Sequence, residues 1–136
     1  MRPLAVLLAV AGLTACAVAP HAATPQVAAV PGRNYVVFFQ EWSAALDASA
    51  LQTIAAAAGT AAQDPSAAVS VAGFADPLGS VQANIYLTET RAQVVTDQLA
   101  ADGVAAARIH QHAAGKVPHQ LTSQESRRVV ISAGGR

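Results

Sequence analysis

The sequence predicts a domain of the α/β class, in which helices pack on one face of a sheet. Two long segments with helical spacing of apolar residues alternate with four short segments that suit strands. Their order along the chain is strand, helix, strand, helix, strand, strand. The chain has 136 residues, of which 53% are hydrophobic, but alanine supplies much of that share. We therefore expect one domain with a core of modest size.

The first predicted elements are a buried strand and a helix. The strand is predicted over Tyr35–Phe39, a β-branched and aromatic run. Asp47 is positioned to cap a helix over residues 48–62. The helix ends at Asp64 and Pro65, because the residue before a proline is disfavoured in the helical conformation. The predicted packed side of this helix consists of Leu46, Ala50, Leu51, Ile54, Ala58 and Ala61.

A second strand and a long helix follow. The strand is predicted over residues 69–72, which are short and alternate in character, and residues 73–79 form a loop. Ser80 is positioned to cap a helix that runs to about Ala101, and Gly103 ends it.

The third and fourth strands are predicted over residues 107–113 and 127–132. His110 and His112 share one face of the third strand because side chains alternate, and His119 follows in a loop. Such a group resembles a set of metal ligands. No nearby acidic residue or cysteine completes the set, so we interpret these as surface histidines and predict no metal site.

The long helix places an arginine where its pattern demands an apolar residue. Its apolar arc consists of Val81, Ile85, Leu87, Ala92, Val94, Val95 and Leu99. The opposite side consists of Tyr86, Glu89, Thr90, Gln93, Thr96 and Asp97. Asn84 and Arg91 fall inside the apolar arc, and a buried guanidinium needs an anionic partner, for which Asp76 is the nearest candidate in sequence. Alternatively, Arg91 forms a structural ion pair or reaches the rim of the packed face.

The segment GFADPLGSVQANIYLTETRAQVV, which starts at Gly73, resembles the signature of the OmpA C-terminal-like family of noncovalent peptidoglycan-binding domains in Gram-negative envelopes. The positions that hold the family spacing are Gly73, Asp76, Gly79, Asn84, Leu87, Arg91 and Ala92, with Thr88 in place of the usual serine. Phe74 and Ala75 replace the family's histidine and threonine. The resemblance extends from about Tyr35 to Ile131. It implies a βαβαβ mixed-sheet sandwich with helices on one face and a helical turn near Ser123–Ser126.

The resemblance also implies a ligand, the diaminopimelate of the peptidoglycan stem peptide, whose side-chain end carries an ammonium and a carboxylate. Asp76 would receive the ammonium, and Arg91 would hold the carboxylate by a two-pronged hydrogen bond. Asn84 would brace the loop or bind the ligand. Arg127 and Arg128 resemble the family's terminal arginine pair, and the resemblance favours Arg128 as the residue that points toward the site.

The N-terminus predicts export and lipidation. Residues 1–15 read as a signal peptide, with a positive start and a short apolar stretch that ends in Leu13–Cys16, which resembles a bacterial lipobox. Cys16 would then be lipidated, or else the segment is an ordinary signal peptide with a coincidental cysteine. Residues 16–33 form an Ala/Pro-rich tether, and residues 34–136 form the OmpA-like domain. Because Ala17 is not aspartate, we expect the lipid anchor to lie in the outer membrane, on its periplasmic face.

Several function classes are excluded on sequence grounds. Without residues 1–15, seven basic side chains face eight acidic ones, which gives no basis for nucleic-acid binding. The sequence contains neither a nucleophile motif nor a phosphate-binding glycine loop, so we predict no enzyme activity and no cofactor. The predicted function is a noncovalent tether between the outer membrane and peptidoglycan. The alternative is an envelope module that binds a protein partner, with Asp76 and Arg91 as a structural pair.

Overall fold

The computed structural model describes residues 32–75, 79–116 and 123–135 of the chain. Its strands are β1 (Arg33–Phe38), β2 (Val69–Ala75), β3 (Ile109–Lys116) and β4 (Arg128–Ala133). Its helices are α1 (Ala48–Gln63), α2 (Val81–Ala101) and the short α3 (Ser123–Ser126), with a 3₁₀ turn, η1 (Ala106–Arg108), before β3. The predicted α/β class, the order of the elements and the helical turn at residues 123–126 are confirmed.

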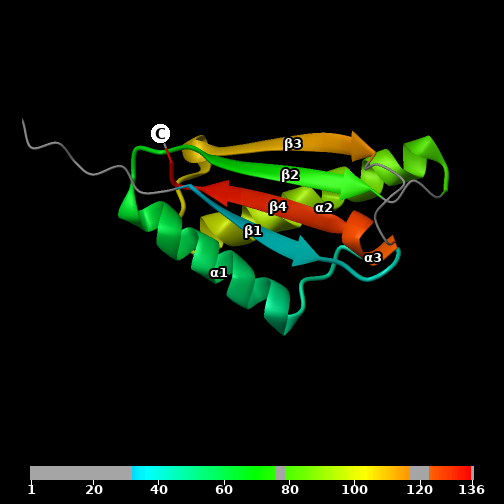
Figure 1. Cartoon of the computed structure of the whole chain (residues 1–136), viewed down its shortest axis with the longest axis horizontal. Helices are drawn as coiled ribbons and strands as arrows, with labels where there is room; N and C mark the ends of the chain where they lie inside the picture. The colour runs from blue at the N-terminus through cyan, green and yellow to red at the C-terminus, as the bar shows by residue number, and fades with distance from the viewer. Residues whose placement is uncertain (1–31, 76–78, 117–122, 136) are drawn as a thin grey trace, which may run out of the picture.

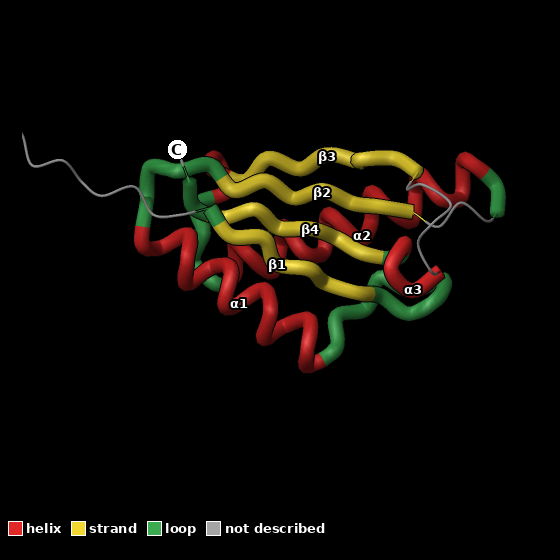
Figure 2. Tube along the Cα trace, viewed as in Figure 1, coloured by secondary structure: helices red, strands yellow, loops and turns green. Residues whose placement is uncertain are grey.

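The strands form one mixed sheet in the order β1-β4-β2-β3. β2 and β3 run parallel, whereas β4 runs antiparallel to both β1 and β2. Figures 1 and 2 show the strands side by side, with α1 and α2 running along the sheet. Both long helices pack against the same face, and no described helix covers the other face.

Local sequence signals determine where the long helices begin and end. The Asp47 carboxylate accepts a hydrogen bond from the Ala50 backbone N–H at 2.7 Å, and the Ser80 hydroxyl accepts one from Ala83 at 3.1 Å. Each cap satisfies a backbone donor that the first helical turn leaves without a partner. Gly103 ends α2 with a φ of 98°, in the left-handed region that favours glycine. The predicted caps are therefore confirmed.

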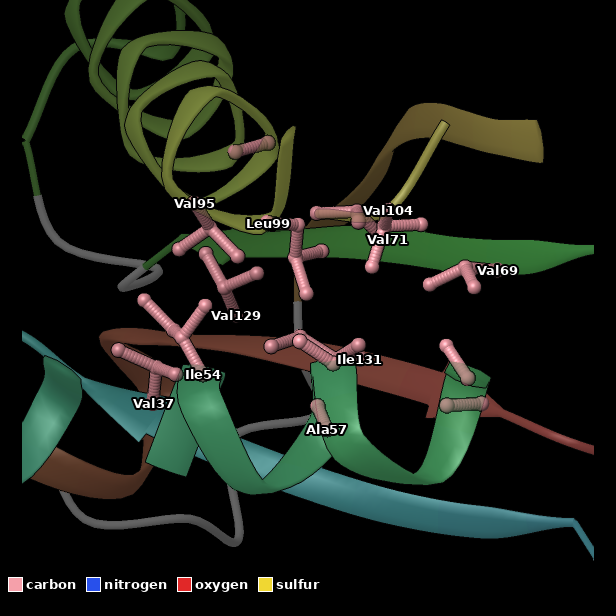
Figure 3. Packing of buried hydrophobic residues seen from close by; sticks show 14 of the residues in the cluster. Val37, Ile54, Ala57, Val69, Val71, Val95, Leu99, Val104, Val129 and Ile131 are labelled. Carbon is pink, nitrogen blue, oxygen red and sulfur yellow. The ribbon is translucent and has the colours of Figure 1, made fainter. Parts of the chain in front are cut away.

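The core lies between the sheet and the two long helices (Figure 3). Its fully buried members include Val37, Ile54, Val69, Val71, Val95, Leu99, Val129 and Ile131. Gly73 lets α2 approach β2 closely, because a Cβ at this position would lie 2.9 Å from the backbone oxygen of Thr88. The glycine of the sequence signature thus has a packing role.

Some residues that we predicted on buried faces of β1, α1 and α2 are exposed. Tyr35–Phe39 is not a fully buried strand: Phe38 is 47% exposed, because β1 is an edge strand whose second face carries no described helix. Leu51 on α1 is also exposed, and Ala57 is buried in its place. Val81 and Ile85 are exposed. Figure 1 shows the first turns of α2 projecting beyond the end of β2, where the sheet cannot cover them.

Every strand also differs from its predicted boundaries by one to three residues at one end or both. β2 continues to Ala75, three residues into the predicted loop. β3 begins only at Ile109, because residues 106–108 form η1. Arg108 in this turn donates to the carbonyl oxygens of Ala61, Asp64 and Ala67 at 2.8–2.9 Å, and so ties the turn to the end of α1. Within the described ranges, no helix combines the length and the hydropathy needed to cross a membrane.

Candidate functional site

Four parts of the fold meet at one end of the sheet. They are the end of β2, the start of α2, the start of β4 and the loop between β1 and α1, and all lie near α3 (Figure 1). The opposite end of the sheet carries the beginning and the end of the domain. Gly32 lies there against Gly134 and Gly135. Gly79 and the start of α2, which belong to the sequence signature, therefore lie at the other end of the sheet from the domain termini.

Arg91 is the central residue of this end of the molecule. Its side chain is only 2% exposed, which confirms that the arginine on the apolar arc of α2 is buried. Nε donates to the carbonyl oxygen of Ser43 and Nη2 to that of Gln40, each at 2.8 Å. The guanidinium carbon lies 5.2 Å from the centre of the Phe39 ring. Arg91 thus fastens α2 to the β1–α1 loop, and its described partners are neutral carbonyls and a ring.

The surroundings of Arg91 disfavour its positive charge. Burial is the main cause, and the charge of Arg127 is the second; together they lower the pKa of Arg91 from its ordinary value to about 10. That pKa still lies well above neutral pH, so the guanidinium remains charged. A cation that is desolvated beside another cation is stabilised when an anion approaches it.

Arg127, rather than Arg128, is the arginine on the side of Arg91. Successive side chains of a strand point to opposite faces, and Val129 points into the core, so Arg127 shares the helix-covered face. Its Nε donates to the carbonyl oxygen of Phe39 at 3.4 Å, next to the ring that Arg91 contacts. Of the two arginines, Arg127 and not Arg128 thus lies on the face of the sheet that carries Arg91.

Arg128 lies on the other face of the sheet. Its guanidinium carbon is 4.3 Å from the centre of the Phe74 ring, and Nη1 donates to the carbonyl oxygen of Glu125. Phe74, which stands at the family's histidine position, therefore supports a cation–π contact. Phenylalanine at position 74, where the family has histidine, thus packs against Arg128 on the face of the sheet opposite Arg91.

Asn84 of α2 and Trp42 of the β1–α1 loop both lie close to one glycine. Gly79 has a φ of 94°, which glycine adopts without strain. A Cβ at this position would lie 3.9 Å from both polar atoms of the Asn84 carboxamide and 3.5 Å from Cη2 of Trp42. Asn84 is buried, as its place on the apolar arc predicts. Asp76 lies outside the described residues, between the described Ala75 and Gly79.

The structure does not gather metal ligands within the ranges it describes. His110 and His112 are exposed on β3, in agreement with their interpretation as surface residues, and His119 lies outside those ranges. Over the same residues, no three histidine, cysteine, aspartate or glutamate side chains are placed to hold a metal ion. Cys16 and the predicted signal peptide also lie outside the described residues.

The fold and this site define a small α/β module in which the second helix buries an arginine at one end of a mixed sheet. A model of the OmpA family matches residues 38–130, and the chain belongs to this family. A search of curated proteins found no match.

Solved structures share the fold. One is the OmpA-like domain of FopA1 from Francisella tularensis, with a TM-score of 0.65 and 20% identity over 76% of this chain and 73% of that one. Another is the peptidoglycan-associated lipoprotein from Burkholderia pseudomallei, with a TM-score of 0.64 and 21% identity over 74% of this chain and 90% of that one. A third is the cell wall anchor of the T6SS from Pseudomonas aeruginosa, with a TM-score of 0.58 and 22% identity over 77% of this chain and 82% of that one.

Proposed function

We propose that this protein binds peptidoglycan noncovalently and, as a lipoprotein, tethers the outer membrane to the cell wall. Membership of the OmpA family supports wall binding, as do the two similar structures described as a peptidoglycan-associated lipoprotein and a cell wall anchor. The observation that carries the proposal is the environment of Arg91, a desolvated guanidinium with a second cation, Arg127, nearby. Such a site favours an anionic ligand.

The ligand in this proposal is the zwitterionic end of diaminopimelate in the stem peptide. Its carboxylate binds the N–H donors of Arg91 that remain beside the two bonds to the β1–α1 loop. Asp76 receives the ammonium, and Asn84 braces the loop between them. Arg127 takes the place that the resemblance gave to Arg128, as a second positive charge near the carboxylate. Binding requires no catalytic step, and we assign the protein no enzymatic activity and no cofactor.

The placement of the chain ends fits a tether. In the proposal, residues 1–15 are a signal peptide, Cys16 carries the lipid and residues 16–33 link it to the domain at residue 34. The first described residues lie at the end of the sheet opposite Arg91. A lipid on the N-terminal side would thus leave the site facing away from the membrane, toward the wall. The proposed location is the periplasmic face of the outer membrane.

Replacing Asp76 by asparagine tests the ligand site. We expect Asp76→Asn to weaken co-sedimentation with purified sacculi by about tenfold to a hundredfold, since it removes a charge-assisted hydrogen bond of about 1.5–3 kcal/mol. Asp97→Asn makes the same chemical change on the exposed side of α2 and should bind like the wild type. Walls that carry lysine in place of diaminopimelate should bind the wild type less well, because the carboxylate is missing.

A second candidate function follows from the hydrogen bonds of Arg91. Because its guanidinium holds the carbonyl oxygens of Gln40 and Ser43, the arginine can serve structure alone. The domain would then bind a protein partner in the envelope. A folded Asp76→Asn variant that sediments with sacculi as fully as the wild type would favour this candidate and would refute the ligand site.

Lipidation makes a separate prediction. Replacing Cys16 by alanine should move the protein from the membrane fraction to the soluble periplasmic fraction, because several acyl chains on one residue give stable anchoring. Fractionation of cells that express each form measures this shift. A mature wild-type protein without added lipid mass in mass spectrometry would contradict the proposed anchor, while leaving wall binding by the domain untouched.

A further inference from the structure

The β1–α1 loop presents the single tryptophan of the sequence to solvent. Trp42 is 65% exposed and has a φ of 52°, in the left-handed region that non-glycine residues seldom adopt. Both features are unfavourable for the isolated domain, because a large apolar surface stays in water and the backbone is strained. A residue with these two properties is a candidate for a binding role.

Arg91 fixes the position of this tryptophan. The two carbonyl oxygens that its guanidinium binds belong to Gln40 and Ser43, which flank Trp42 in the chain. A third hydrogen bond joins the Ser43 backbone N–H to the Gln40 carbonyl oxygen at 3.3 Å and closes the turn. The backbone on both sides of Trp42 is thus held, and the indole is presented in a defined place rather than on a free loop.

That place adjoins the proposed ligand site. The edge of the indole faces the position at Gly79 where a Cβ would lie, and the Asn84 carboxamide faces the same position. Gly79 follows the segment that contains Asp76. A ligand held at Arg91, which binds the carbonyl oxygens of Gln40 and Ser43, would therefore lie near the indole.

We propose that Trp42 stacks on a sugar ring of the glycan strand that carries the stem peptide. This inference rests on the proposed function and extends it from the peptide to the glycan. A pyranose ring offers an apolar C–H face to a flat aromatic surface, and its hydroxyls need polar partners at the rim. The neighbours Gln40 and Glu41 are both exposed and polar, and can supply such partners. In the chain, Trp42 stands between the polar residues Glu41 and Ser43.

Two ligands that share a peptide and differ in sugar test this inference. One is a disaccharide-tripeptide that ends in diaminopimelate, and the other is the same tripeptide without sugar. We expect the wild-type protein to bind the disaccharide form about twofold to tenfold more tightly, the range that an aromatic contact supplies. Because Trp42 is the only tryptophan, its emission reports on the contact and should shift to shorter wavelength only with the sugar-bearing ligand.

Trp42→Asn is the variant that removes the indole and leaves the fold intact. Asparagine accepts a left-handed backbone conformation, so the turn should persist without the aromatic ring. We expect this variant to bind both ligands equally, at the affinity of the wild type for the bare tripeptide, as measured by calorimetry. Tyr86→Ala is the matched control: it removes an exposed aromatic side chain from α2 and should keep the preference for sugar.

Three outcomes would overturn the inference. Equal affinity of the wild type for both ligands, or a sugar preference that survives in Trp42→Asn, would refute stacking on Trp42 and leave peptide recognition at Asp76 and Arg91 intact. If the wild type binds neither ligand, the proposed function itself fails, and the inference fails with it.

Discussion

Arg91→Lys is expected to destabilise the domain by about 2–4 kcal/mol, although the charge is retained. The guanidinium bridges the carbonyl oxygens of Gln40 and Ser43, which the compact ammonium of lysine cannot do from the same backbone position. The loss combines weakened hydrogen bonds from a charged donor with a Ser43 carbonyl oxygen that lacks a partner, whereas the Gln40 carbonyl oxygen keeps the Ser43 backbone N–H. Denaturant unfolding followed by circular dichroism measures the change.

The matched control is Arg33→Lys, the same substitution at an exposed position of β1, which should alter stability by less than about 0.5 kcal/mol. Binding to sacculi should also fall for Arg91→Lys, because the variant loses the planar fork that fits a carboxylate. Equal unfolding curves for Arg91→Lys and the wild type would show that the guanidinium does not hold the loop.

Leu99→Ala should cost about 2–5 kcal/mol, the range found when a buried leucine is truncated. Leu99 is fully buried, and Figure 3 shows its side chain pointing from α2 into the core, near Val71 and Ile131. Truncation removes apolar contact and leaves a cavity that helix and sheet can close only in part. Thermal or denaturant unfolding measures the loss.

Gln93→Ala on the same helix is the control for Leu99. Gln93 is exposed, and its amide donates to the carboxylate of Asp97, an interaction between neighbouring turns that contributes a few tenths of a kcal/mol. We expect a change within about 0.5 kcal/mol. Similar losses for the two variants would mean that the buried face of α2 is assigned wrongly.

Local chemistry made the fold predictable. Asp47, Ser80 and Gly103 act within a few residues of their own positions, so the sequence alone indicates where both long helices begin and where α2 ends. The burial of Phe38 could not be judged in the same way, because it depends on the strand order, which places β1 at an edge. Hydrophobic character alone does not tell a half-covered strand from a fully covered one.

The site was predictable only in part, for a related reason. Helical periodicity identified Arg91 as buried, but its partners are backbone carbonyls, which every residue has and no pattern marks. Alternation with the buried Val129 places Arg127 on the face of Arg91 and Arg128 on the other face, a signal that the sequence itself contains. The left-handed backbone of Trp42 left no trace in the sequence.

The opposite placement of the domain termini and Arg91 has a mechanical consequence. A pull between residue 33 and the site is directed along β1, which runs from one end of the sheet toward the other (Figure 1). β1 is paired with β4 in antiparallel register from Arg33↔Ala133 to Phe38↔Arg128, and the hydrogen bonds of such a ladder lie across the strands. The load therefore shears the whole ladder at once instead of peeling it open bond by bond. In the proposed tether, a membrane drawn away from the wall would thus pull along the stiffest direction of the domain.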